Sequence, residues 1–291
     1  MKKTDKIPKR YRCLNRTLSG VDNRLKPVYH EEKTGWRDSM VGVYFSGTGN
    51  TKHCVERFAS EIDSEAKCFS IEDTQSVSEL ARHDTIIFGF PVYYSNIPKI
   101  AKDFIAQNSE CFRGKKVFII ATRASFNAGG IVNAARMFKS CGGSVAGSLQ
   151  LNMPNNIGDM LITKLVFSKN YEKIIERADR KIAKAARRFR LNKPVRSGLS
   201  VFNYILSGIL SWLWFYPTTD RCIHAPAVDK AKCSGCGLCE RICPMSNISV
   251  VGGEVVSGEN CTVCYRCFNR CPQKALTVLG RKAYDQYKIL Q

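Results

Sequence analysis

The sequence predicts an α/β fold: a doubly wound, five-stranded parallel sheet followed by a small α+β domain. Two observations lead to this prediction. From residue 40 to residue 190, short apolar segments alternate with amphipathic helical segments, and continuous apolar strands separated by helices indicate a parallel sheet covered on both faces. Beyond residue 223, two copies of one tight cysteine spacing follow each other, which indicates a second, compact unit.

The first strand is expected at 40–46, where the sequence MVGVYFS is rich in β-branched and aromatic residues. A helix then begins at Lys52, with Val55, Phe58 and Ile62 on one face. The same alternation continues along the chain. It predicts strands at 67–71, 85–90, 117–122 and 145–151, and helices at 77–82, 100–106, 131–139 and 170–190.

The loop between the first strand and its helix consists of glycines and small polar residues: Ser46, Gly47, Thr48, Gly49, Asn50 and Thr51. Glycines let a backbone approach a phosphate closely, and the N–H groups of the first helical turn attract an anion. The loop has neither the G-x4-G-K-[ST] nor the G-x-G-x-x-G spacing. It therefore predicts a phosphate site of another kind, with a plain strand–helix turn as the alternative.

This loop resembles the FMN phosphate loop of flavodoxins, S/T-x-T-G-x-T, through Ser46, Thr48, Gly49 and Thr51. The resemblance implies a flavodoxin-like sheet that binds FMN at the carboxyl ends of its strands. It also implies ring contacts from two later loops. These comprise Pro91, Tyr93, Tyr94, Ser95 and Asn96 in the second loop, and Ser125, Phe126, Asn127 and Gly129 in the third.

Three aromatic side chains of these loops, Tyr93, Tyr94 and Phe126, are candidates for stacking on the flavin ring. Simple packing against the protein is the alternative for each of them. The second loop differs from the Gly-Asp loop that is common in small flavodoxins, because two prolines, Pro91 and Pro98, flank its tyrosines.

Both cysteine runs read C-x2-C-x2-C-x3-C-P and end at Pro244 and Pro272. This spacing resembles the bacterial two-cluster ferredoxins, in which the fourth cysteine of each run binds the other cluster. The resemblance implies two 4Fe–4S clusters, one held by Cys233, Cys236, Cys239 and Cys271 and the other by Cys261, Cys264, Cys267 and Cys243. Zinc sites or a disulfide scaffold are the alternatives. Between the runs, Gly252-Gly253 predicts a hairpin turn.

The formal net charge is +20, which favours acidic redox-partner proteins or an anionic membrane surface. No nucleic-acid-binding motif is present, so nucleic acid is not an expected partner. Fourteen cysteines and no recognisable signal peptide favour a reducing, cytoplasmic location. The six cysteines outside the two runs show no metal-binding spacing.

The chain is expected to divide into a basic arm (1–39), a flavodoxin-like domain (40–192), an apolar connecting helix (193–222), a two-cluster ferredoxin domain (223–281) and a tail (282–291). Within the connector, 199–216 carries no charge. Three alternatives remain for it: packing within the protein, contact with a membrane surface, or a membrane span.

Taken together, residues 40–290 resemble the fused flavodoxin–ferredoxin proteins of anaerobes. The resemblance implies electron transfer between FMN and two 4Fe–4S clusters. Two alternatives remain: a flavin-free docking module attached to a ferredoxin, and a flavin-dependent reductase of a small acceptor. No catalytic acid, base or nucleophile is predicted.

Overall fold

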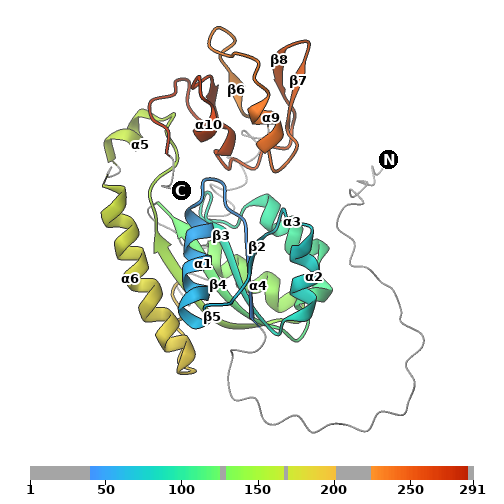
Figure 1. The fold of residues 1–291 in the computed structure, drawn as a ribbon, viewed down its shortest axis with the longest axis vertical. Helices are drawn as coiled ribbons and strands as arrows, with labels where there is room; N and C mark the ends of the chain where they lie inside the picture. Colours follow the sequence, from blue (N-terminus) through green and yellow to red (C-terminus); the bar gives the residue numbers. More distant parts are fainter. Residues whose placement is uncertain (1–39, 125–128, 167–169, 201–223, 288–291) are drawn as a thin grey trace, which may run out of the picture.

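The fold is described from a computed structural model, which places residues 40–124, 129–166, 170–200 and 224–287. Five parallel strands form one sheet in the order β2-β1-β3-β4-β5 (Figure 1). Their bounds are β1 (Met40–Tyr44), β2 (Cys68–Ser70), β3 (Thr85–Pro91), β4 (Lys116–Arg123) and β5 (Ser144–Asn152). The doubly wound, flavodoxin-like order predicted from the sequence is confirmed.

Helices cover both faces of this sheet (Figure 1). One face carries α1 (Asn50–Ile62) and α6 (Tyr171–Arg190), and the other carries α2 (Gln75–Arg82), α3 (Lys99–Gln107) and α4 (Gly130–Ser140). Each helix presents an apolar stripe to the strands, as the helical periodicity of the sequence predicts.

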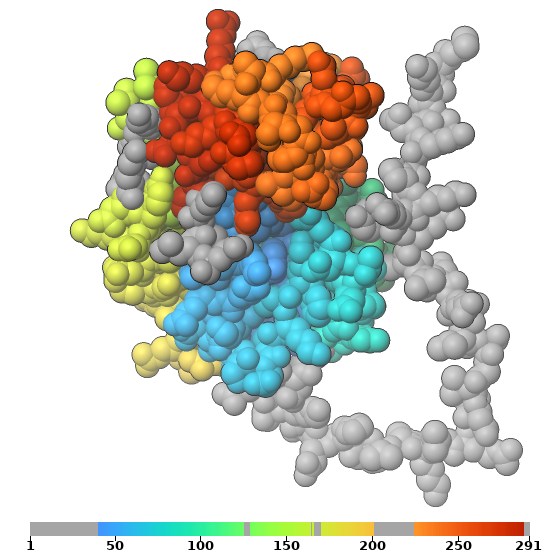
Figure 2. Space-filling view, turned by 45° about the horizontal axis from the view of Figure 1, so that its top comes forward, coloured from blue at the N-terminus to red at the C-terminus, as the bar shows by residue number. Residues whose placement is uncertain are grey.

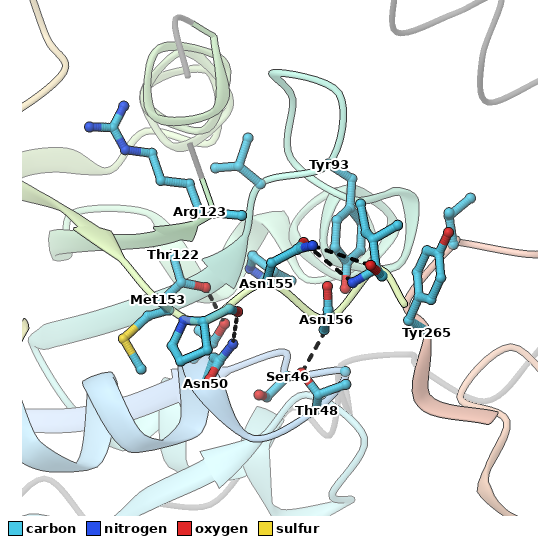
Figure 3. A pocket seen from close by; sticks show the side chains of 18 of the residues that line it. Ser46, Thr48, Asn50, Tyr93, Thr122, Arg123, Met153, Asn155, Asn156 and Tyr265 are labelled. Atoms are coloured by element: carbon cyan, nitrogen blue, oxygen red, sulfur yellow. Dashed lines mark hydrogen bonds between the residues drawn. The ribbon is translucent and has the colours of Figure 1, made fainter. Parts of the chain in front are cut away.

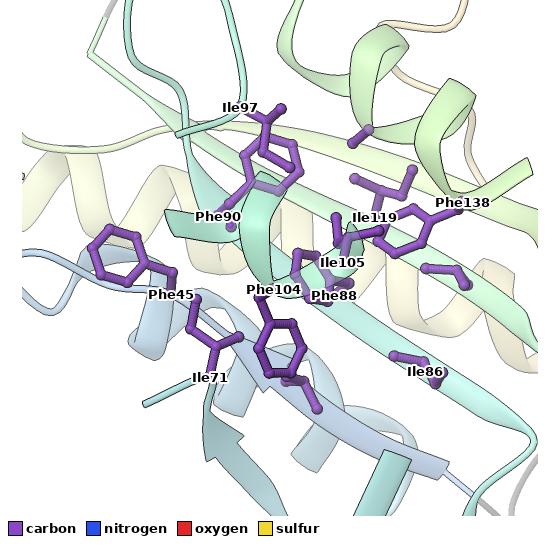
Figure 4. Packing of buried hydrophobic residues seen from close by; sticks show 14 of the residues in the cluster. Phe45, Ile71, Ile86, Phe88, Phe90, Ile97, Phe104, Ile105, Ile119 and Phe138 are labelled. Carbon is purple, nitrogen blue, oxygen red and sulfur yellow. The ribbon is translucent and has the colours of Figure 1, made fainter. Parts of the chain in front are cut away.

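The two faces bury separate aromatic cores. Under α2, α3 and α4, the ring of Phe88 contacts that of Phe138 at 5.1 Å between centroids (Figure 4). Under α1 and α6, Phe58 stacks on Phe118 at 4.4 Å, and Phe189 meets both rings edge-on. Burying each large apolar side chain contributes roughly 1.5–3 kcal/mol, so these cores fix the strand ends that carry the functional loops.

The carboxyl-terminal part contains two short helices, α9 (Leu238–Ile242) and α10 (Arg266–Arg270), and two small antiparallel sheets. One is the predicted hairpin, β7 (Ile248–Val251) and β8 (Glu254–Ser257), and its two turn glycines both have positive φ. The other pairs β6 (Ala227–Val228) with β9 (Leu276–Thr277). Figure 2 shows this part, orange and red, seated directly on the blue amino-terminal elements.

Two further short elements, α5 (Leu161–Val166) and the 3₁₀ helix η2 (Ser109–Phe112), were not predicted. The arm 1–39 lies outside the described residues, and so does 199–216 beyond its first two residues. Leu199 packs against the core under α2, α3 and α4. Among the helices that the structure describes, none combines the length and the apolar character that crossing a membrane requires.

Candidate functional site

A pocket opens where β1, β3, β4 and β5 reach their carboxyl ends, at the boundary between the two parts of the chain (Figure 3). Parallel strands of this fold class bind their ligands at that edge. The lining residues come from four loops of the sheet and from the second cysteine run: Ser46, Gly47, Thr48, Asn50, Thr51, Pro91, Val92, Tyr93, Tyr94, Ser95, Thr122, Arg123, Ala124, Met153, Pro154, Asn155, Asn156, Ile157, Val263 and Tyr265.

The loop after β1 forms a tight turn into α1. Gly49 adopts φ 99°, a left-handed conformation that favours glycine, and its N–H donates to Ser46 Oγ at 3.1 Å. The hydroxyls of Thr51 and Thr122 lie 2.8 Å apart and bond to each other. With no acidic residue in the first turn of α1, the positive end of the helix dipole faces the pocket without a competing carboxylate.

The side chain of Asn50 holds this turn in place. Its Nδ2 donates to the carbonyl of Pro154 at 2.9 Å, and its Oδ1 accepts from the hydroxyl of Tyr287 at 2.7 Å. Thr48 Oγ1 accepts from Asn156 Nδ2 at 3.3 Å. We call the turn from Ser46 to Thr51 the phosphate-type loop. It is therefore fixed by the loop after β5 and by the carboxyl-terminal tail.

The second predicted loop folds back on itself through two backbone hydrogen bonds between Tyr93 and Asn96. Tyr94 and Ser95 adopt positive φ at its tip. Asn96 does not line the pocket; its Oδ1 instead accepts from the backbone N–H of Ile97 and from a side-chain amide of α4, which secures the loop.

Two polar atoms of this loop, Tyr93 Oη and Ser95 Oγ, are buried without a hydrogen-bond partner among the described residues. Burial is the main reason why the pKa of Tyr93 lies well above its usual value, so its hydroxyl remains protonated at neutral pH. Buried polar groups are normally hydrogen-bonded. Two partnerless groups at one pocket are therefore the groups that a polar ligand would satisfy.

The third predicted loop begins with Thr122, Arg123 and Ala124, which all line the pocket. The candidates Ser125, Phe126 and Asn127 lie outside the described residues. Gly129 directly precedes α4 and does not line the pocket, and Gly49 does not line it either.

Sequence reasoning missed two further walls of the pocket. One is the stretch from Met153 to Ile157 after β5, which ends at the same edge of the sheet as the three predicted loops. The other consists of Val263 and Tyr265. Both residues lie between cysteines of the second run, and only the docking of the two parts brings them to the pocket.

The cysteines of the two runs border two small cavities. Each cavity is bordered by the first three cysteines of one run and the fourth cysteine of the other run. Cys233, Cys236, Cys239 and Cys271 border one of them. The other cavity is bordered by Cys243, Cys261, Cys264 and Cys267. None of these eight cysteines forms a disulfide. Among the described residues no group of three or more His, Cys, Asp or Glu is arranged to hold a single metal ion.

The two cysteine cavities differ in depth. Cys236 is exposed in the first set, whereas Cys264 is buried in the second and belongs to the core under α2, α3 and α4. Burial raises the pKa of Cys264 to about 11, although the nearby Arg266 acts against this shift. We call the first set the outer cysteine site and the second the inner cysteine site.

The inner cysteine site is in direct contact with the phosphate-type loop. A Cβ on Gly47 would lie 2.3 Å from the carbonyl oxygen of Cys264 and 3.1 Å from Tyr93 Oη. Because real Cβ atoms do not approach that closely, only glycine fits at this position. The backbone of Cys264 and the hydroxyl of Tyr93 thus lie at the boundary between the pocket and the inner site.

Arg266 fastens this contact. Its guanidinium donates to both carboxylate oxygens of Glu72 at 2.6 and 2.7 Å, and to the carbonyls of Ser46 at 2.9 Å and Gly47 at 3.3 Å. A further bond, of 3.2 Å, reaches the carbonyl of Ile242, the residue before Cys243 of the inner cysteine site. The planar fork of arginine suits a carboxylate bound through two oxygens, so one side chain joins both parts of the chain.

Tyr265 is held by a buried carboxylate. Its hydroxyl donates to Asp159 Oδ1 at 2.9 Å. Asp159 Oδ2 in turn accepts the backbone N–H groups of Val278, Leu279 and Gly280 at 2.6, 2.9 and 3.0 Å. Asp159 is only 1% exposed, and these four bonds satisfy its charge. The ring of Tyr265 is therefore fixed at the pocket (Figure 3).

Comparison with known proteins supports both halves of this description. Residues 42–129 match the family model of the flavodoxin domain, and residues 226–249 match that of the 4Fe–4S binding domain. A comparison with curated proteins gave no match.

Similar solved structures align with the sheet half of the chain. Megasphaera elsdenii flavodoxin is 21% identical, with 50% of this chain and 99% of that chain covered and a TM-score of 0.37. Oxidised flavodoxin 1 of Bacillus cereus is 19% identical, with 50% and 95% covered and a TM-score of 0.36. An archaeal flavodoxin is 18% identical, with 51% and 98% covered and a TM-score of 0.36. With both family matches in place, the chain is a fusion of a flavodoxin-like domain with a carboxyl-terminal 4Fe–4S binding domain.

Proposed function

We propose that this protein transfers electrons between FMN, bound at the sheet edge, and two 4Fe–4S clusters, bound at the outer and inner cysteine sites. One observation carries the proposal: Val263 and Tyr265, which alternate with the cysteines of the inner site, also line the pocket at the sheet edge. When bound, FMN exchanges one or two electrons, and each cluster exchanges one.

The pocket suits FMN in its polar groups. The N–H groups at the start of α1 and the hydroxyl of Thr48 would hold the phosphate. Tyr94 and Tyr93 lie on the second loop, where a flat ring would rest, and the partnerless Tyr93 Oη and Ser95 Oγ offer hydrogen bonds there.

The cysteine sites suit cubane clusters because each brings four thiols around a cavity rather than to a single point. The exchanged fourth cysteine, Cys271 in the outer site and Cys243 in the inner site, is the arrangement of two-cluster ferredoxins. Backbone N–H groups already donate to the sulfurs of Cys243, Cys261 and Cys271. Such bonds stabilise negative charge on a cluster and raise its potential.

The depths of the sites give the electron path an order. The inner cysteine site adjoins the pocket through Gly47 and Tyr93, whereas the outer cysteine site has an exposed cysteine, Cys236. Electrons would thus run between the pocket and the inner site, then the outer site, then a partner protein. The charge of +20 favours an acidic partner.

Cofactor counting tests the proposal. The full chain, purified without oxygen and reconstituted with iron, sulfide and FMN, is expected to hold about eight iron atoms and one FMN. Replacing Cys264 or Cys236 with serine should each remove about half of the iron. Cys141→Ser, outside both runs, is the matched control and should lose none. A wild-type chain that binds no FMN, or a Cys264→Ser chain that keeps all its iron, would contradict the proposal.

A further inference from the structure

A second cavity adjoins the pocket at the sheet edge. It measures about 620 Å³ and lies between α6 and the carboxyl ends of β4 and β5. Three residues line both cavities: Ala124, Met153 and Asn155. The two spaces therefore share a wall, and a molecule in the second cavity would lie beside a ligand in the first. A volume of this size is typical of small-molecule sites.

We call this second cavity the groove. The charged residues that line it are all positive. Four of its residues are cations of α6, Arg177, Arg180, Lys181 and Lys184, and none is acidic. Arg180 has an ion pair with Glu176 at 3.7 Å. Within the described part of the chain, Arg177, Lys181 and Lys184 have no ion pair of 4 Å or less. The groove thus gathers cations whose mutual repulsion a bound anion would relieve.

The floor of the groove is apolar. Ile174 and Ala178 face it from α6, and Met153 faces it from the loop after β5. A merely solvated helix face would be convex and surrounded by water. Here the cations surround a concave surface with an apolar floor, which concentrates the positive field. That combination suits an organic anion with both an apolar body and a charged group.

The opposite side of the pocket is closed to large partners. Val263 and Tyr265 wall it there, and Tyr265 is fixed by Asp159. A protein therefore meets the carboxyl-terminal part first, whereas the groove adjoins the pocket along Ala124, Met153 and Asn155.

We propose that this groove binds a small organic anion, bearing sulfonate, carboxylate or phosphate groups, as a redox substrate of the flavin site. The inference rests on the proposed function for the redox step, but the binding itself depends on the cations of α6 and on the apolar floor of the groove. In that step two electrons leave the reduced protein, and the acceptor takes up these electrons with two protons from water. For a quinone, the product is the hydroquinone.

The test compares 1,4-naphthoquinone-2-sulfonate with neutral 1,4-naphthoquinone. Calorimetric titration of the oxidised, FMN-loaded full chain measures binding. Single-turnover reoxidation of photoreduced protein, freed of excess reductant, measures the redox step. The double variant Arg177→Ala/Lys181→Ala removes two groove cations. Arg187→Ala/Arg190→Ala, in the last turn of the same helix and outside the groove, removes the same charge and serves as the matched control.

The groove variant should bind the sulfonate about tenfold more weakly, since each exposed charge pair is worth up to about 1 kcal/mol. Binding of the neutral quinone should not change, and added salt should weaken sulfonate binding in the wild type. The proposal would be overturned if the two double variants lost the same affinity for the sulfonate, or if the groove variant lost the same affinity for both quinones. A chain without FMN would contradict the proposed function instead, and the calorimetric comparison of the variants would still decide on the groove.

Discussion

Removing the guanidinium of Arg266 should loosen the contact between the two halves of the molecule. Arg266→Ala leaves Glu72 without its partner, and these two side chains are only 19% and 28% exposed. Breaking a buried pair in this way costs about 3–5 kcal/mol. Because water still reaches part of this pair, we take the lower end, about 3 kcal/mol. The lost bonds to the carbonyls of Ser46 and Gly47 add about 1 kcal/mol.

A total near 4 kcal/mol is a large share of the stability of an ordinary domain, about 5–15 kcal/mol. Urea unfolding of the full holoprotein, followed by circular dichroism, measures this loss. Flash photoreduction, followed by flavin absorbance, measures transfer to the inner cysteine site, which should slow because the gap widens. Arg241→Ala is the control, since this exposed arginine bonds only within the carboxyl-terminal part, to the carbonyl of Cys236.

A double-mutant cycle separates the ion pair from the other effects. Arg266→Ala/Glu72→Ala should be less destabilised than the sum of the two single variants, with a coupling of about 2 kcal/mol. If Arg266→Ala unfolded at the wild-type urea concentration and transferred electrons at the wild-type rate, the reasoning on this contact would be refuted.

Three further outcomes are expected. Gly47→Ala should weaken FMN binding more than tenfold in a fluorescence titration, because its Cβ would lie 2.3 Å from the carbonyl oxygen of Cys264; wild-type affinity would show that the loops yield easily. Cys264→Ser should lower FMN affinity as well as iron content, whereas Cys236→Ser, at an exposed position, should leave FMN affinity unchanged. Burial lowers the pKa of Lys102 to about 8 from its usual 10.5. The unfolded chain therefore binds more protons between pH 8 and 10.5, so stability should rise across this window; Lys102→Met should be more stable at pH 7 and should flatten that rise, as pH-dependent urea unfolding would show.

Local patterns in the sequence were sufficient for most of the fold. Apolar runs such as 85–90 and the stripe of α6 depend on spacing along one element, so periodicity alone placed them. The hairpin at Gly252-Gly253 was predictable for the same reason, since its turn chemistry is local. Two-residue strands such as β6 carry too little pattern, and their pairing depends on a partner far along the chain.

The candidate site was predictable only in its local parts. The loop from Ser46 to Thr51 and the tyrosine loop lie at the pocket as expected. Tyr265 comes from more than 200 positions later, and its place depends on Asp159 and Arg266. Neither residue type signals such a role from the sequence. The cations of α6 looked like an ordinary solvated face until the loop after β5 supplied the opposite wall.

The wall formed by Val263 and Tyr265 has a consequence for how the proposed cofactors would be acquired. One segment belongs both to the pocket and to the inner cysteine site. A ligand bound on one side of that segment would also stabilise the position that the ligand on the other side requires. The coupling is reciprocal by thermodynamic necessity. FMN and the cluster of the inner cysteine site are therefore expected to bind cooperatively. Few molecules should then carry FMN without the cluster that would accept its electrons.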